Sequence, residues 1–221
     1  MYLSHKYKFL FLRTPKTASS SLSDFFINNV DDPDAIYTEV EDSNLPGTLS
    51  EDIVSKYRPY RFYHFTVQQL IDEGVLTEEQ ARDYYCFALL RNPIDRQKSF
   101  YYFYKKWKSP KTEPSLEEYK SWTANGVFNN DANSAIVQTD LLKIRGEYIG
   151  EYWLFEDLYP KLNEFMTQTL GLKCPPLPKH KTDTRKNKNN EINFDIESLS
   201  DIQNHFMNDF AMYQELLRKK I

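Results

Sequence analysis

The feature that most constrains this chain of 221 residues is a strand-to-helix segment near its start, residues 8–22, with the sequence KFLFLRTPKTASSSL. Residues 9–12 are all apolar, as expected of a short strand that is buried on both faces of a sheet. Thr14 and Pro15 end this strand. Apolar residues then recur at helical spacing, at Leu22, Phe25, Phe26 and Val30. The segment therefore predicts a strand, a tight turn and a helix in direct succession.

The turn of this segment carries the residue types of an anion site. Lys16 precedes a run of hydroxyl side chains at residues 17–21, which only Ala18 interrupts. The first N–H groups of the following helix have no partner within the helix, and the helix dipole adds partial positive charge there. Lys16 adds a full charge, and the small Ala18 lets the backbone approach a ligand. We expect this turn to hold a phosphate-like group.

Two other interpretations of the turn need to be weighed. The nucleotide-binding loop G-x-x-x-x-G-K-[ST] does not fit, because no glycine lies in residues 1–22 and Lys16 precedes the turn instead of closing it. A plain strand-to-helix turn with a capping serine would also contain proline and serines, and it needs no ligand. The turn alone does not decide between this plain turn and an anion site.

A second strand-to-helix junction repeats the arrangement. Residues 85–90 (YCFALL) predict another buried strand, and Arg91, Asn92 and Pro93 follow it directly. Ser99 lies two turns into the expected helix, and arginine and serine both donate hydrogen bonds to phosphates. Because ligands of open α/β sheets bind at the carboxyl ends of the strands, we expect two anion sites at one edge. Such a pair suits a nucleotide that carries phosphates at both ends.

Together the two junctions resemble the donor site of the sulfotransferases that use 3′-phosphoadenosine 5′-phosphosulfate (PAPS). Residues 15–22 fit the pattern P-K-T-x-S-[ST]-S-[LF] of their 5′-phosphosulfate loop. Residues 91–101 fit R-[ND]-P-x-x-R-x-x-S-x-Y, the pattern of their 3′-phosphate site. Residues 155–158 (FEDL) are similar to a recurrent strand-to-helix junction of these enzymes. The carbohydrate-type sulfotransferases are closest in pattern.

The resemblance implies an enzyme that transfers a sulfuryl group from PAPS to an acceptor hydroxyl or amine by in-line displacement, leaving 3′-phosphoadenosine 5′-phosphate (PAP). As in phosphoryl transfer, such a protein mainly positions the reactants and stabilises charge. Lys16 would stabilise the charge on the leaving phosphate oxygen, and no metal is required. The resemblance assigns donor binding to Arg13, Pro15, Lys16, Thr17, Ala18, Ser19, Ser20, Ser21, Arg91 and Ser99.

An acceptor hydroxyl also needs a base. His64 lies between the two motifs, in a position similar to the catalytic histidine of carbohydrate-acting relatives. Histidine ordinarily titrates near neutral pH, which suits a general base. Two alternatives stay open: His64 packs among its aromatic neighbours without a catalytic role, or Glu156 or another carboxylate is the base.

Strands that alternate with helices predict an α/β fold, with a single domain over residues 1–221 and a central, mostly parallel sheet flanked by helices. The resemblance specifies the P-loop-like sulfotransferase fold, with donor motifs at residues 13–22 and 91–101. Further strands are expected over residues 35–40 and 152–155, and further helices over residues 51–57, 67–73, 77–84, 93–107, 134–142, 157–170 and about 198–219, with another that begins at Ser115.

Composition excludes several classes of protein. A net charge of −4 gives no general polyanion-binding surface, so we expect no nucleic-acid partner. Cys86 and Cys174 have no metal-ligand spacing and form no disulfide framework, which fits a reducing compartment. The chain shows neither a signal peptide nor a run of about 18 apolar residues. We therefore expect a soluble, cytoplasmic protein without membrane insertion.

A basic loop is expected over residues 175–190, with most of its charge in residues 179–188 (KHKTDTRKNK). A solvated surface loop explains such a run of charge. The functional alternative is a flap over the 3′-phosphate or a grip on an anionic acceptor. The R-K-G signature of the cytosolic small-molecule sulfotransferases is absent, so a donor contact by Arg185 is in doubt.

Two other functions stay open. A kinase or other P-loop phosphotransferase would need the missing glycines and a magnesium ion held by carboxylates. An inactive nucleotide-binding module would bind the nucleotide without turnover. The sequence does not define the acceptor either: a saccharide, a peptide tyrosine, a lipid headgroup and a small alcohol all fit. It does not define the oligomeric state.

Overall fold

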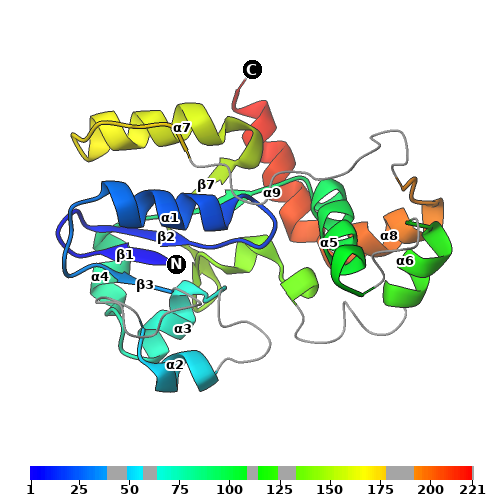
Figure 1. The fold of residues 1–221 in the computed structure, drawn as a ribbon, viewed down its shortest axis with the longest axis horizontal. Helices are drawn as coiled ribbons and strands as arrows, with labels where there is room; N and C mark the ends of the chain where they lie inside the picture. The colour runs from blue at the N-terminus through cyan, green and yellow to red at the C-terminus, as the bar shows by residue number, and fades with distance from the viewer. Residues whose placement is uncertain (39–48, 57–63, 109–113, 124–132, 178–191, 221) are drawn as a thin grey trace. The chain divides into compact units, whose positions relative to one another are not determined.

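The computed structural model describes residues 1–38, 49–56, 64–108, 114–123, 133–177 and 192–220 (Figure 1). The chain divides into two compact units. The first comprises Met1–Leu90 and Gln138–His180, and the second comprises Arg91–Val137 and Lys181–Ile221. Each unit has a hydrophobic core of its own. The single domain expected over residues 1–221 stays a prediction.

A five-stranded sheet with the strand order β3-β1-β2-β4-β7 forms the centre of the first unit. Its strands are β1 (Tyr2–Ser4), β2 (Phe9–Leu12), β3 (Ile36–Tyr37), β4 (Tyr85–Leu90) and β7 (Glu151–Leu154). β2 pairs in parallel with β4, and β4 pairs in parallel with β7. The α/β class, with a central sheet that has a parallel core and is flanked by helices, is thereby confirmed.

Two short antiparallel strands extend the sheet beyond β2. In β1, Tyr2 pairs with Phe11 of β2 on one side and with Tyr37 of β3 on the other. β1 was not expected, because three residues are too few to show a strand period in the sequence. β3 is the strand expected over residues 35–40. It occupies Ile36–Tyr37, and residues 39 and 40 lie outside the described residues.

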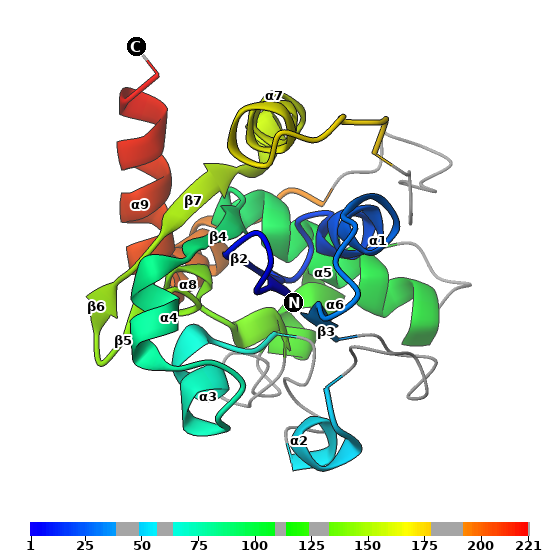
Figure 2. The same cartoon turned by 90° about the vertical axis from the view of Figure 1, so that its left-hand side faces the viewer.

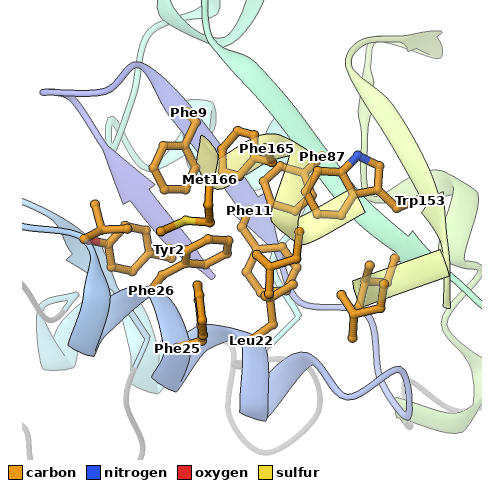
Figure 3. Packing of buried hydrophobic residues seen from close by; sticks show 14 of the residues in the cluster. Tyr2, Phe9, Phe11, Leu22, Phe25, Phe26, Phe87, Trp153, Phe165 and Met166 are labelled. Atoms are coloured by element: carbon orange, nitrogen blue, oxygen red, sulfur yellow. The ribbon is translucent and has the colours of Figure 1, made fainter. Parts of the chain in front are cut away.

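Aromatic side chains fill the space between one face of the sheet and two helices, α1 (Ser19–Asn29) and α7 (Leu158–Glu164). Phe11 of β2, Phe87 of β4 and Trp153 of β7 gather there with Phe26 of α1 (Figure 3). Phe87 stacks on Trp153 with the ring centroids 4.0 Å apart. Both helices lie on this side of the sheet (Figures 1 and 2). The helical spacing of apolar residues in α1 therefore marks the side of α1 that is buried against the sheet.

The opposite face of β4 carries α4 (Glu78–Asp83) and the 3₁₀ helix η3 (Gln138–Asp140). The Cys86 thiol donates a hydrogen bond to the carbonyl oxygen of Ala81 over 3.3 Å. Burial raises the pKa of Cys86 to about 12, so this thiol has the packing role that its apolar context predicts. α4 begins at Thr77 with the expected capping box, and α3 (Val67–Asp72) begins at Thr66 in the same way.

Helices make up most of the described part of the second unit. They are α5 (Pro93–Lys108), α6 (Leu116–Trp122), α8 (Ile196–His205), α9 (Met207–Arg218) and the 3₁₀ helix η2 (Asn133–Ala135). Their shared core contains Tyr101, Tyr119, Ile192, Ile202 and Phe206. The aromatic run of α5 divides between core and surface, since Tyr101 is fully buried and Phe103 is 43% exposed.

Three expected helices take a different form. The helix expected over residues 134–142 is replaced by η2 and η3, with the β-branched Ile136 and Val137 between them. The helix expected over residues 198–219 is two helices, α8 and α9, because the backbone of the fully buried Phe206 leaves helical geometry with φ −108° and ψ 29°. The helix expected over residues 157–170 starts as α7 and ends as the π-helix η5 (Phe165–Thr169).

The remaining described elements are short. They are α2 (Glu51–Lys56), the hairpin strands β5 (Lys143–Ile144) and β6 (Glu147–Tyr148), and the 3₁₀ helix η4 (Phe155–Asp157), which follows β7. Gly150 joins the hairpin to β7 with a φ of 76°. A Cβ at Gly150 would lie 2.1 Å from the carbonyl oxygen of Cys86, so only glycine lets the chain pass this close to β4.

Gly150→Ala is therefore expected to destabilise the protein by clearly more than the cost of a left-handed residue, which is about 1–2 kcal/mol. The matched control is Gly146→Ala, where φ is 87° but nothing lies within 4 Å of the added Cβ. Urea unfolding of both variants measures the difference. Equal losses of unfolding free energy would show that the close approach to Cys86 has no energetic weight.

Candidate functional site

The turn after β2 has an unusual backbone for a segment without glycine. Lys16 has a φ of 63° and Ala18 a φ of 59°, so both residues adopt the left-handed conformation on either side of Thr17. A left-handed residue other than glycine costs about 1–2 kcal/mol, so the surrounding structure must hold this turn in place. A left-handed residue beside a right-handed one turns successive N–H groups toward one point, which is how backbone nests bind anions. The two left-handed residues are the part of that pattern that this turn shows.

The start of α1 adds donors to the same turn. Ala18 is the N-cap residue, and no side chain makes a cap hydrogen bond there. The first-turn N–H groups therefore keep the partial positive charge of a helix start. The Thr17 hydroxyl donates to the carbonyl oxygen of Thr14 over 2.8 Å, which closes the turn. The expected strand, turn and helix are thus all present in the structure.

The Arg13 side chain forms hydrogen bonds that stabilise this turn. Its buried guanidinium donates from Nη2 to the Ser20 hydroxyl over 2.8 Å and from Nη1 to the carbonyl oxygen of Thr38 over 3.5 Å. Ser19 and Ser21 are buried and Ser20 is half-buried. A direct donor contact by Arg13 stays a prediction. In the structure, the guanidinium contributes by fixing the Ser20 side chain at the start of α1.

His64 is attached to the same turn. It is 8% exposed, and its ring Nδ1 lies 2.7 Å from the backbone carbonyl oxygen of Arg13. A carbonyl oxygen only accepts, so Nδ1 carries the proton of this bond. In the neutral ring, Nε2 is then the basic nitrogen, as a general base requires. Arg13 thus contacts both groups: its carbonyl oxygen binds His64, the candidate base, and its side chain binds Ser20.

The second motif begins where β4 ends. The Oδ1 atom of Asn92 accepts from the Ile94 N–H over 2.9 Å and from the Asp95 N–H over 3.4 Å, so Asn92 caps α5. Pro93 is the first residue of α5. Arg91 and Ser99 are both half-buried. They belong to the second compact unit, whereas the turn with Lys16 and His64 belongs to the first.

The parallel strands place three candidate segments at one edge of the sheet. β2 ends before Arg13, β4 ends before Arg91, and β7 ends before Glu156 in η4. Because the three strands run in parallel, their carboxyl ends meet at the same edge. Glu156, the alternative base, is exposed. Residues 179–188, which include Arg185, lie outside the described residues.

Three residues in or near the two motifs were not among the predicted site residues. Thr14 and Thr38 supply carbonyl oxygens that anchor Thr17 and Arg13, and backbone acceptors leave no signal in side-chain identity. Arg96 is fully buried, and burial lowers its pKa to about 10, with the charge of Asp209 opposing that shift and the charge of Arg91 adding to it. The sequence signal that could have indicated a role for Arg96 is its position as the second arginine of the R-[ND]-P-x-x-R pattern.

Two searches of the described residues gave negative results. No group of three or more histidine, cysteine, aspartate or glutamate side chains in the described ranges is arranged to hold a metal ion. Among the helices of those ranges, none has the length and the apolar character that crossing a membrane requires.

Comparison with known proteins gave one match. A family model described as the sulfotransferase family matches residues 1–214, and so includes both motifs and His64. No curated protein and no solved structure matches the chain.

The left-handed geometry of Ala18 can be tested by replacing two alanines with glycine, since the expected changes in stability differ between them. Ala18→Gly is expected to be neutral or to stabilise the protein by up to about 1 kcal/mol, because the relief of strain exceeds the added chain entropy of glycine. Ala211→Gly, at an exposed position inside α9, is expected to lose about 1 kcal/mol. Thermal unfolding without ligand measures both changes. A loss at Ala18 as large as that at Ala211 would contradict the left-handed turn.

Proposed function

The chain belongs to the sulfotransferase family, and from this premise we propose that it transfers a sulfuryl group from PAPS to an acceptor hydroxyl. The observation that carries the proposal is the turn after β2, in which a motif of the family's 5′-phosphosulfate loop has two left-handed residues, Lys16 and Ala18, directly before the start of α1. PAPS supplies the activated sulfuryl group. The protein contributes binding, orientation and charge stabilisation.

The 5′ end of the donor fits the turn and the start of α1. A 5′-phosphosulfate needs several N–H and O–H donors close together, and residues 16–21, Thr17 through its backbone, supply N–H groups, serine hydroxyls and the Lys16 ammonium. Pro15 is buried and fixes the chain before the turn. Lys16 is assigned the stabilisation of charge on the oxygen that leaves the sulfuryl group.

The 3′-phosphate is assigned to Arg91 and Ser99. A guanidinium offers paired donors that match a phosphate, and the Ser99 hydroxyl adds another donor from two turns further along α5. Arg91 directly follows β4, the strand that pairs in parallel with β2. The proposal needs no metal ion.

His64 is assigned the role of general base. Its Nδ1 proton is held by the carbonyl oxygen of Arg13, which leaves Nε2 to accept the proton of the acceptor hydroxyl. This bond also ties the base to the residue at the start of the donor turn. A hydroxyl acceptor, including that of a saccharide, is the class we propose. An amine acceptor, a cytoplasmic location and the absence of a nucleic-acid partner stay predictions.

The kinase alternative has less support, because the turn reaches its left-handed geometry at Lys16 and Ala18 instead of at the glycines of a P-loop. An inactive nucleotide-binding module would share the donor site. Turnover with any acceptor distinguishes the enzyme from this module.

Calorimetric titration with PAP tests the donor site. Wild-type protein is expected to bind PAP, and Lys16→Ala and Arg91→Ala are each expected to weaken binding about tenfold to a hundredfold, because each loses charged contacts worth about 1.5–3 kcal/mol. Arg145→Ala is the matched control, since this arginine is exposed in the β5–β6 turn. Absence of PAP binding, or a preference for ATP with magnesium, would favour the kinase.

Replacement of His64 tests the base. His64→Asn keeps a donor for the Arg13 carbonyl oxygen but has no basic nitrogen, so we expect kcat to fall about 10²- to 10⁴-fold with unchanged PAP affinity. The acceptor is first identified by screening saccharides, tyrosyl peptides and alcohols with PAPS. His5→Asn is the control, because His5 also forms a ring hydrogen bond, 2.8 Å from the Tyr84 hydroxyl. A kcat unchanged in His64→Asn would exclude His64 as the base.

A further inference from the structure

A buried arginine on α5 takes no part in the transfer proposed above. The Arg96 side chain is fully buried, and none of its guanidinium nitrogens has a hydrogen-bond partner among the described residues. Its charge is met by the carboxylate of Asp209 in α9, with Nη2 and Oδ2 3.9 Å apart. The ring of Phe206 lies 4.5 Å from the guanidinium carbon. Taking such an ion out of water costs several kcal/mol, so its presence calls for a reason.

Arg96 lies between the two residues assigned to the 3′-phosphate. It is five residues after Arg91 and three before Ser99, within the first turns of α5. Its two partners mark the junction of α8 and α9: Phe206 is the residue at which the helix breaks, and Asp209 lies in the first turn of α9. Arg96 thereby joins this part of α5 to the α8–α9 junction inside the second unit.

The neighbouring residue makes a second connection. Gln97 is also fully buried, and its Nε2 donates to the carbonyl oxygen of Ser134 in η2 over 2.8 Å. His205, at the end of α8, has its Nε2 2.9 Å from the carbonyl oxygen of Ala135. The start of α5, η2 and the α8–α9 junction are therefore linked in a closed circuit of buried and half-buried contacts.

We propose that Arg96 is a positioning residue for the 3′-phosphate site, acting through its ion pair with Asp209 and its contact with Phe206. The proposal rests on the assignment of the 3′-phosphate to Arg91 and Ser99. The circuit fixes the first turns of α5, and with them the orientation of Arg91 and Ser99. The full burial of Arg96 argues against direct contact with the nucleotide. A buried ion pair is sensitive to direction and distance, whereas apolar side chains would allow α5 to slide.

The test compares PAP with adenosine 5′-monophosphate (AMP), which lacks the 3′-phosphate. Calorimetry gives the ratio of the two affinities in wild-type protein, Arg96→Met, Asp209→Leu and the double variant. We expect each single change to lower the PAP preference about tenfold, as small misplacements of binding groups do. The double variant should lose no more than one single variant, because both changes break one interaction.

Lys105→Met is the matched control. Lys105 is a second buried cation on α5, paired with Glu118 of α6 in the later part of the helix. Its loss should lower the melting temperature without changing the ratio of PAP to AMP affinity. Should Arg96→Met fail to fold, Arg96→Lys and Asp209→Asn, which keep the size of the side chains, are measured in its place with the same expected loss of preference.

Three results would overturn the proposal. An unchanged affinity ratio in folded Arg96 variants would reduce Arg96 to a structural role. If Arg96→Met lowers the ratio of PAP to AMP affinity as much in Asp209→Leu protein as in wild-type protein, Arg96 is a direct ligand of the phosphate. If wild-type protein binds PAP and AMP equally well, the proposed 3′-phosphate site does not exist. This result would contradict the proposed function itself, whatever the role of Arg96.

Discussion

The parallel pairing of β2 with β4 is the constraint on which the rest of the first unit depends. Leu12 pairs with Ala88, so the two strands end close together at one edge of the sheet. The aromatic cluster that includes Phe11 and Phe87 holds this register from one face, since a slip of β2 by one residue against β4 would turn Phe11 to the other face, away from Phe87. The turn with Lys16 and the chain leading to Arg91 both start from this edge. Packing in the core therefore determines where the two motifs leave the sheet.

Much of this fold could be predicted from local sequence. The continuous apolar runs of β2 and β4, the capping boxes at Thr66 and Thr77, and the asparagine cap of α5 all depend on residues close together in the chain. What could not be predicted depends on distant partners. β1 is stabilised by pairing with β2 and β3, and the break at Phe206 accompanies the burial of its ring in the core of the second unit. Neither leaves a periodic signal.

The same distinction holds for the candidate site. The motif residues 15–21 and the cap at Asn92 could be recognised because their spacing is local. The bond between His64 and Arg13 joins residues 51 positions apart through a carbonyl oxygen, so the residue types reveal nothing of it. The burial of Arg96 depends on Asp209, which lies far along the chain. The sequence thus predicts which groups are available for chemistry, while tertiary contacts determine how these groups are oriented.

The glycine-free turn after β2 has a consequence for the entropy of binding. Glycine loses more conformational freedom on folding than any other residue, and a glycine-rich loop keeps more of that freedom in the native state. With Lys16 and Ala18 in left-handed conformations held by buried neighbours, the turn is ordered when the chain folds and not when a ligand arrives. A ligand that binds to such a turn is bound more tightly than by a flexible loop, because the turn is already ordered and binding carries no further entropy cost for ordering it. The strain at Lys16 and Ala18 is therefore met when the chain folds, before the proposed donor binds.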